Sequence, residues 1–198
     1  MDVSKICETS GVHFALSEKN LTHFAIYKWA GSYMGDGFIL DVGSELGFGS
    51  SVLMRPGRTV LGVDINFSTS HFAHKNFSSD DSSFIQANAL KLPVSSNRCM
   101  GICLVNVLHL IEDPLYILKE CYRVLSSQYP LIITIPLDIN LPEEWKQPSP
   151  RMRLTKEISK VFDNYYFPER INKFRTSFIN KINPMNQEMD FMVAVCTK

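Results

Sequence analysis

Residues 39–50 read ILDVGSELGFGS, and a second apolar stretch, residues 60–65, reads VLGVDI. The first stretch joins a short apolar strand to a glycine-bearing turn and the start of a helix. The second stretch is a strand that ends in the carboxylate of Asp64. In an open α/β sheet, such a turn lets a ligand approach backbone amides, while an acid at the tip of the next strand binds ribose hydroxyls. The two stretches therefore predict a nucleotide-type cofactor site.

Apolar strands and helices alternate around these two stretches. We expect strands at 38–42, 59–64, 83–87, 101–107 and 131–135, and helices at 18–34, 49–54, 67–77 and 113–126. Asp113 followed by Pro114 is typical of a helix start, because aspartate caps free amides and proline is tolerated in the first turn. The alternation predicts a parallel sheet that is covered by helices on both faces.

The pattern changes after the last of these strands. Prolines spread over residues 142–150 predict a loop or a mobile cover, and a helix is expected at 155–162. Two late strands, at 174–182 and 188–196, flank the turn signal at 183–186 and so indicate a hairpin. We divide the expected single domain, residues 1–198, into an N-terminal helical cover (1–35), a cofactor-binding core (36–137) and an acceptor-side segment with the terminal hairpin (138–198).

The composition favours a small partner. The 198 residues include 45% hydrophobic side chains, which is enough for one domain with its own core. Twenty Lys and Arg balance twenty Asp and Glu, so the net charge indicates neither nucleic acid nor an anionic membrane. Five cysteines without a CxxC pair indicate reduced thiols, and the sequence shows no signal peptide and no apolar run of about 20 residues. We therefore expect a soluble cytoplasmic protein whose oligomeric state stays open.

Four segments, in this order, resemble the small class I S-adenosylmethionine-dependent methyltransferases of the type 11 group. ILDVGSELGFGS is similar to the first motif of that family, GVDI to the second, FIQANALKLP to the adenine loop, and LHLIEDPLYILKECYRVL to the segment that follows it. The resemblance covers about residues 36–137. It implies a doubly wound, Rossmann-like α/β fold with a mainly parallel seven-stranded sheet and an antiparallel last strand. It also implies S-adenosylmethionine as cofactor and methyl transfer to a small-molecule acceptor.

The resemblance implies a set of cofactor-binding residues. They are Asp41, Gly43, Ser44, Glu45, Gly47, Asp64, Ile65, Asn88, Ala89, Leu90 and Asn106. Asp41, Gly43 and Gly47 would shape the loop beside the methionine part of the cofactor, and Asp64 would bind the ribose diol. No set of metal ligands is expected.

The resemblance also implies roles for Asn88, Leu90 and His109. Asn88 would hold the adenine ring through its side chain, and Leu90 would hold it through its backbone. His109, after the fourth strand, is the candidate catalytic base for a hydroxyl acceptor, although a histidine packed near the core is the alternative reading.

Glu45 departs from the family pattern, because it stands where the family usually has a glycine. The glutamate side chain could obstruct the cofactor, repel its carboxylate or pair with its ammonium group. The alternative function is therefore a degenerate binding or scaffold protein that has the fold without catalysis. A nicotinamide-dependent enzyme is a further alternative, against which the missing GxGxxG pattern argues. Asn88 replaces an acid of the family, and its amide oxygen can accept the same hydrogen bond.

Aromatic and histidine side chains outside the matched segments leave two readings open. His23 and Tyr27 are spaced i, i+4 and so share one face of the expected first helix. That helix is either a lid on the cofactor or part of the core. The cluster at 165–167 either lines an acceptor pocket or packs beneath the preceding loop.

Overall fold

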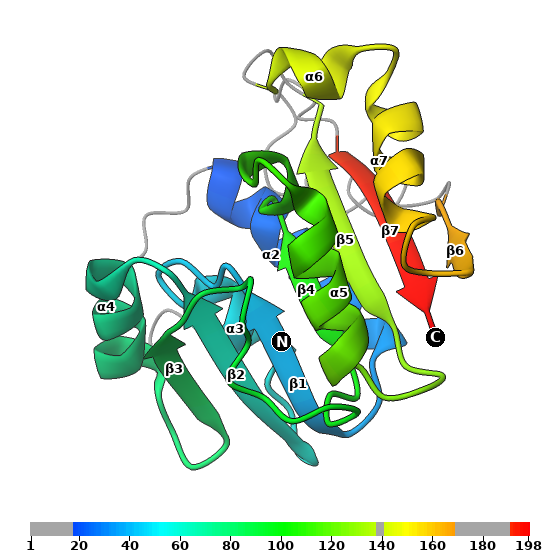
Figure 1. Cartoon of the computed structure of the whole chain (residues 1–198). Helices are drawn as coiled ribbons and strands as arrows, with labels where there is room; N and C mark the ends of the chain where they lie inside the picture. The colour runs from blue at the N-terminus through cyan, green and yellow to red at the C-terminus, as the bar shows by residue number, and fades with distance from the viewer. Residues whose placement is uncertain (1–17, 138–140, 169–190) are drawn as a thin grey trace.

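The computed structural model describes residues 18–137, 141–168 and 191–198. Its strands form one seven-stranded sheet in the order β3-β2-β1-β4-β5-β7-β6 (Figure 1). The strands are β1 (Gly37–Val42), β2 (Arg58–Asp64), β3 (Ser82–Gln86), β4 (Ile102–Val105), β5 (Leu131–Pro136), β6 (Asn164–Tyr166) and β7 (Phe191–Thr197). Strands β1 to β5 pair in parallel, whereas β7 is antiparallel to both β5 and β6. The predicted mainly parallel sheet with an antiparallel last strand is confirmed.

Helices cover both faces of the sheet. They are α2 (Glu18–Tyr33), α3 (Phe48–Leu53), α4 (Phe67–Phe77), α5 (Pro114–Val124), α6 (Glu143–Lys146) and α7 (Pro150–Ile158), with a 3₁₀ turn, η1 (Leu108–Leu110). In Figure 1, α5 crosses in front of the sheet and α2 lies behind it. None of the helices in the described residues is long and apolar enough to cross a membrane.

Alternation along the strands gives each face its own core. Ile39 of β1 and Cys103 of β4 pack with side chains of α2 and α3, whereas Leu40 and Leu104 pack with side chains of α5, α6 and α7. These side chains are fully buried. A sheet that is buried on both faces is the arrangement expected for parallel strands. It leaves the carboxyl edge of the sheet as the place for a ligand.

The segment after β5 differs from its prediction. A loop was expected over residues 142–150, but α6 lies within it and α7 begins at Pro150, five residues before the expected helix. The Ser149 side chain accepts a hydrogen bond from the Met152 amide, so a serine cap and a first-turn proline start this helix. Trp145 of α6 is buried against the core, which explains why the segment folds back.

The predicted C-terminal hairpin is tested only in part. Its second strand is present as β7, and in the described residues β7 pairs with β5 and β6. The expected strand at 174–182 and the turn at 183–186 lie outside the described residues. The aromatic cluster at 165–167 falls mostly in β6, the edge strand beside β7.

Arg58, the first residue of β2, fixes the end of helix α2. Its guanidinium is buried and donates hydrogen bonds to the carbonyls of Gly31 (2.7 Å), Met34 (2.5 Å) and Gly35 (2.9 Å) at the end of that helix, and to the carbonyl of Leu53 (3.2 Å). The last carbonyls of a helix have no partner within the helix, so this side chain satisfies them. Arg58 therefore holds α2 and α3 against the same end of β2.

We predict that Arg58→Met lowers the free energy of unfolding by about 3 kcal/mol, because it leaves several buried carbonyls without a donor. The matched control is Arg55→Met, which removes an exposed ion pair to Asp36 and should cost less than about 0.5 kcal/mol. Urea unfolding of both variants measures the difference. Equal losses in the two variants would contradict the role assigned to Arg58.

Candidate functional site

The loop between β1 and α3 carries three residues in the left-handed backbone region: Gly43 (φ +77°), Glu45 (φ +49°) and Gly47 (φ +86°). The amide of Gly43 donates to the carbonyl of Val63 (2.8 Å). A Cβ at Gly43 would lie 2.2 Å from a methyl group of Val107. The first glycine therefore lets the loop run against the tips of both β2 and β4, on the two sides of β1.

Gly47, the last glycine of this loop, packs toward α4 and β3. A Cβ at Gly47 would lie 2.8 Å from Ala73 of α4 and 3.0 Å from the ring of Phe84 of β3. Gly47 is also the residue that caps α3. Ser44 is buried between these glycines. Gly47 and Ser44 thus shape the loop from beneath.

Asp64 joins the loop to the tip of β2. One of its carboxylate oxygens accepts a hydrogen bond from the amide of Glu45 (2.9 Å), and the other accepts from the amide of Asn66 (2.9 Å). The side chain of Asn66 caps α4, so Asp64 is not the helix cap. A carboxylate oxygen has two lone pairs, so both oxygens can still accept a hydroxyl proton.

These elements enclose a cavity of about 580 Å³ at the carboxyl edge of the sheet. Its lining consists of His23, Gly43, Glu45, Val63, Asp64, Ile65, Ala87, Asn88, Ala89, Leu90, Val105, Asn106, Val107, Leu110 and Ile111. Eight of the eleven predicted cofactor residues are in this lining. The other three, Asp41, Ser44 and Gly47, are buried or packed beneath the loop. A pocket of this size is typical of a small-molecule site.

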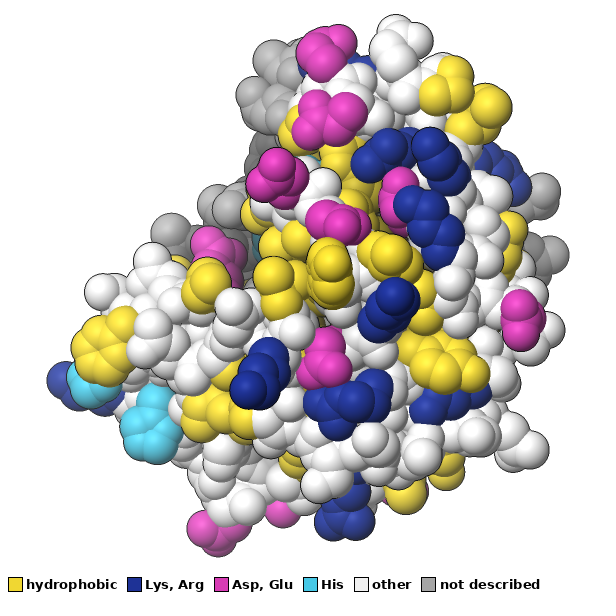
Figure 2. Space-filling model, in the orientation of Figure 1, with side chains coloured by type: hydrophobic (Ala, Val, Ile, Leu, Met, Phe, Trp, Pro, Cys, Tyr) yellow, Lys and Arg dark blue, Asp and Glu magenta, His cyan; other side chains and the backbone are white. Residues whose placement is uncertain are grey.

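The two groups predicted to hold adenine are hydrogen-bonded to each other. The amide of Leu90 donates to the side-chain oxygen of Asn88 (2.9 Å), which closes a short turn. The neighbouring surface is apolar, because Ile65, Leu90 and Leu110 are exposed and line the cavity. Figure 2 shows hydrophobic side chains gathered between α4 and α5 on this face. This end of the cavity therefore presents an apolar wall to a ring.

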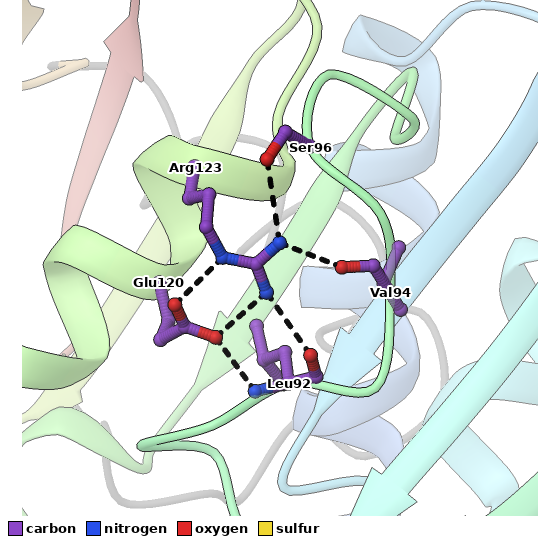
Figure 3. Close-up of polar contacts among 5 residues, drawn as sticks. All are labelled: Leu92, Val94, Ser96, Glu120 and Arg123. Atoms are coloured by element: carbon purple, nitrogen blue, oxygen red, sulfur yellow. Dashed lines mark hydrogen bonds and ion pairs between the residues drawn. The ribbon is translucent and has the colours of Figure 1, made fainter.

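A polar network, which the sequence motifs did not indicate, fixes the segment after Leu90 (Figure 3). Glu120 of α5 accepts from the amide of Leu92 (2.7 Å) and from the guanidinium of Arg123 (2.7 and 2.8 Å). Arg123 also donates to the carbonyls of Leu92 (3.0 Å) and Val94 (2.8 Å). The hydrogen bond from Arg123 lowers the pKa of Glu120. This wall of the cavity is thus tied to α5.

A second network, at the other end of the cavity, connects α2 with the tips of β4 and β5. The side-chain amide nitrogen of Asn106 lies 3.1 Å from Nε2 of His23, and its oxygen accepts from the hydroxyl of Thr134 (3.0 Å). Asn106 has a left-handed backbone (φ +57°), a conformation that costs free energy in residues other than glycine. Helix α2 therefore forms part of the cavity wall.

The loop, the carboxylate at the tip of β2 and the cavity agree with the family comparison. Residues 40–133 match the family model described as "Methyltransferase domain". The resemblance to class I S-adenosylmethionine-dependent methyltransferases is thereby confirmed.

Solved structures share the fold of this methyltransferase domain. A chain of the Haloferax volcanii Trm112 methyltransferase activator complex has a TM-score of 0.64 and 15% identity, over 88% of this chain and 89% of that chain. The [4+2]-cyclase SpnF has a TM-score of 0.64 and 13% identity, over 98% of this chain and 92% of that chain. A third structure is geranyl diphosphate C-methyltransferase from Streptomyces coelicolor A3(2), solved with Mg²⁺, geranyl diphosphate and S-adenosyl-L-homocysteine. It has a TM-score of 0.61 and 12% identity, over 87% of this chain and 75% of that chain. A search of curated proteins found no match.

Asp41 of the methyltransferase domain lies beneath the β1–α3 loop and is fully buried. Its carboxylate accepts hydrogen bonds from Tyr27 of α2 (3.1 Å) and Ser50 of α3 (2.5 Å). Burial raises the pKa of Asp41 to about 6, although both hydrogen bonds oppose this rise. Burial also raises the pKa of Tyr27, so its hydroxyl stays a donor near neutral pH. Asp41 therefore connects the two helices instead of facing a ligand.

His109 of the methyltransferase domain lies in η1, next to Leu110. Leu110 lines the cavity, whereas His109 is not in its lining, and its Nδ1 atom is buried. The assignment of His109 as catalytic base stays a prediction that this geometry does not favour. His23 is the histidine in the described lining. The i, i+4 spacing of His23 and Tyr27 was the sequence signal for it.

We predict that the stability of the protein depends on the charge of Asp41. Its pKa is raised on folding, so the group contributes fully below its unfolded value near 4, and this contribution is lost as the pH rises through about 6. Over that range, wild type should lose about 3 kcal/mol relative to Asp41→Asn, since one pKa unit corresponds to about 1.4 kcal/mol. Urea unfolding of both proteins between pH 4 and 7 measures this difference in the free energy of unfolding.

The matched control for this titration is Asp81→Asn, which removes an exposed carboxylate. A difference between wild type and Asp41→Asn that stays constant from pH 4 to 7 would contradict the prediction.

Proposed function

We propose that this protein transfers a methyl group from S-adenosylmethionine to a small-molecule acceptor. The observation that carries the proposal is the Asp64 carboxylate, which lines the cavity and accepts a hydrogen bond from the β1–α3 loop. The family match over residues 40–133 supports it. A relative with this fold, the Streptomyces coelicolor enzyme, was solved with S-adenosyl-L-homocysteine.

The residues of the cavity fit this cofactor. Asp64 offers two oxygens to a ribose diol, and the apolar side chains of Ile65 and Leu90 lie beside it for the adenine ring. Gly43 lines the cavity, and it lets the loop backbone lie close against Val107, another residue of the lining. The cavity then continues past β1 to Asn106, where the methionine part would lie.

The chemistry needs little from the protein beyond binding and orientation. Bound S-adenosylmethionine supplies an electrophilic methyl group, because its sulfur is positively charged. The cavity walls hold the acceptor in line with that group and exclude water. The mostly apolar lining and the balanced charge favour a small acceptor over a nucleic acid.

Glu45 decides between this proposal and a degenerate binding protein. The loop keeps a left-handed backbone at Glu45 although it lacks a glycine there, so the residue does not prevent the loop conformation. Its side chain is exposed and lines the cavity. We infer that the carboxylate of Glu45 pairs with the ammonium group of the cofactor.

Asp64→Ala should weaken the binding of S-adenosylmethionine at least tenfold, because hydrogen bonds to a charged group contribute about 1.5–3 kcal/mol. Isothermal titration calorimetry measures the affinity, and a thermal melt verifies folding. The control is Asp113→Ala, since Asp113 also accepts from a backbone amide but is not in the cavity lining. Absence of binding by folded wild type would refute the proposed function.

Glu45→Gln should weaken binding of S-adenosylmethionine several-fold, because it removes the partner of the ammonium group. Binding of 5′-methylthioadenosine should not change, since this ligand has the adenine and ribose but no amino acid part. Both affinities are measured by calorimetry. Tighter binding of S-adenosylmethionine to Glu45→Gln would show instead that Glu45 repels the cofactor, as a degenerate binding protein requires.

A further inference from the structure

We propose that His23 of helix α2 is the residue that receives the proton of a hydroxyl acceptor, at the end of the cavity where the methyl group is transferred. This inference rests on the proposed function. His23 lines the cavity, and it lies in the segment outside the family match. The family motifs therefore do not assign it a role.

The sheet order places His23 at the reacting end. The strands run β3-β2-β1-β4, so Asp64 at the tip of β2 and Asn106 after β4 lie on opposite sides of β1. If the nucleoside is bound at the β2 side, then the sulfonium end lies toward Asn106. The imidazole of His23 is within hydrogen-bond distance of the Asn106 side chain.

The hydrogen bonds around Asn106 define the protonation of His23. The backbone amide of Asn106 donates to the carbonyl (3.0 Å) and the hydroxyl oxygen (3.2 Å) of Thr134. The hydroxyl group of Thr134 in turn donates a hydrogen bond to the side-chain oxygen of Asn106. The amide nitrogen of Asn106, which can only donate, faces Nε2 of His23. With the Asn106 amide in this orientation, Nε2 of His23 is the acceptor, and we infer a neutral ring with its proton on Nδ1.

A neutral imidazole suits this position for two reasons. A protonated ring would repel the positive sulfur of the cofactor, whereas a neutral ring does not. The unprotonated Nε2 can also accept a hydroxyl proton, in place of the hydrogen bond from Asn106. Two acidic residues, Glu45 and Asp64, line the same cavity, and Tyr27, one turn further along α2, donates a hydrogen bond to Asp41 of β1. The electrostatic effect of these groups on His23 is the same in both complexes, so it cancels when the two ligands are compared.

The acceptor that fits is an apolar molecule with a hydroxyl group. The cavity wall beside Asn106 includes its two sequence neighbours, Val105 and Val107. In the reaction, the acceptor oxygen forms a bond to the methyl carbon, and the sulfur–methyl bond breaks with its electron pair left on sulfur. The O–H bond breaks, and its proton passes to Nε2 of His23. Atoms and charge balance without a further reactant.

The test compares two ligands that differ in charge, each bound to the protein of residues 1–198. ¹⁵N–¹H correlation spectra of the histidine rings are recorded against pH with S-adenosylmethionine or with S-adenosylhomocysteine, and His23→Gln assigns the resonance. The midpoint of the His23 titration should be lower by about one pH unit with the sulfonium ligand, because a like charge close by disfavours the protonated ring. At pH 7.5 in the free protein, the spectrum should show the proton on Nδ1.

Two comparisons make the result specific. His71 is exposed on α4 and is not in the cavity lining, so its ring resonances should be the same with both ligands. Asn106→Ala removes the donor to Nε2, so the proton should redistribute between the two ring nitrogens of His23.

The outcomes separate the inference from the proposed function. Equal His23 midpoints with both bound ligands would overturn the inference and leave the cofactor site intact. A proton on Nε2 in the free protein would overturn it as well. If neither ligand changes the spectrum, the proposed function itself fails, and the inference fails with it.

Discussion

The carboxylate of Asp64 binds the amide of Glu45 and so attaches the β1–α3 loop to the tip of β2. The loop can reach this position because Gly43 has a positive φ and lets the backbone contact Val107 after β4. Three adjacent strands of the sheet thus meet at one short segment of chain. The cavity exists where they meet, since the strands end there and the helices begin. The same carboxylate that holds the loop also lines the cavity.

Three side-chain contacts attach helix α2 to this arrangement. Arg58 fixes its end, Tyr27 binds the buried Asp41, and His23 binds Asn106. The three contacts are made at successive turns of α2, by residues 23, 27 and 31, and they hold the helix close to the sheet. The question whether α2 is a lid or part of the core has a mixed answer, because its middle is buried while His23 lines the cavity.

The sequence predicted what local patterns determine. Apolar runs and turn residues placed β1 to β5 and α2 to α5 close to their observed bounds, and the family motifs identified eight residues of the cavity lining. It did not predict α6 or the early start of α7, because burial of Trp145 depends on distant parts of the chain. The contact between Arg123 and the segment at Leu92 was missed for the same reason, since 31 positions separate the two residues. A spacing rule cannot find such pairs, whereas the i, i+4 relation of His23 and Tyr27 is local.

The most direct test of the account is a crystal structure of the protein with S-adenosylhomocysteine. We expect the ribose hydroxyls on the carboxylate of Asp64, the adenine against Ile65 and Leu90, and the homocysteine part beside Gly43 toward Asn106. That result would establish that the strand tips and the loop form the cofactor site. A ligand bound elsewhere, or bound with its adenine at Asn106, would contradict the account.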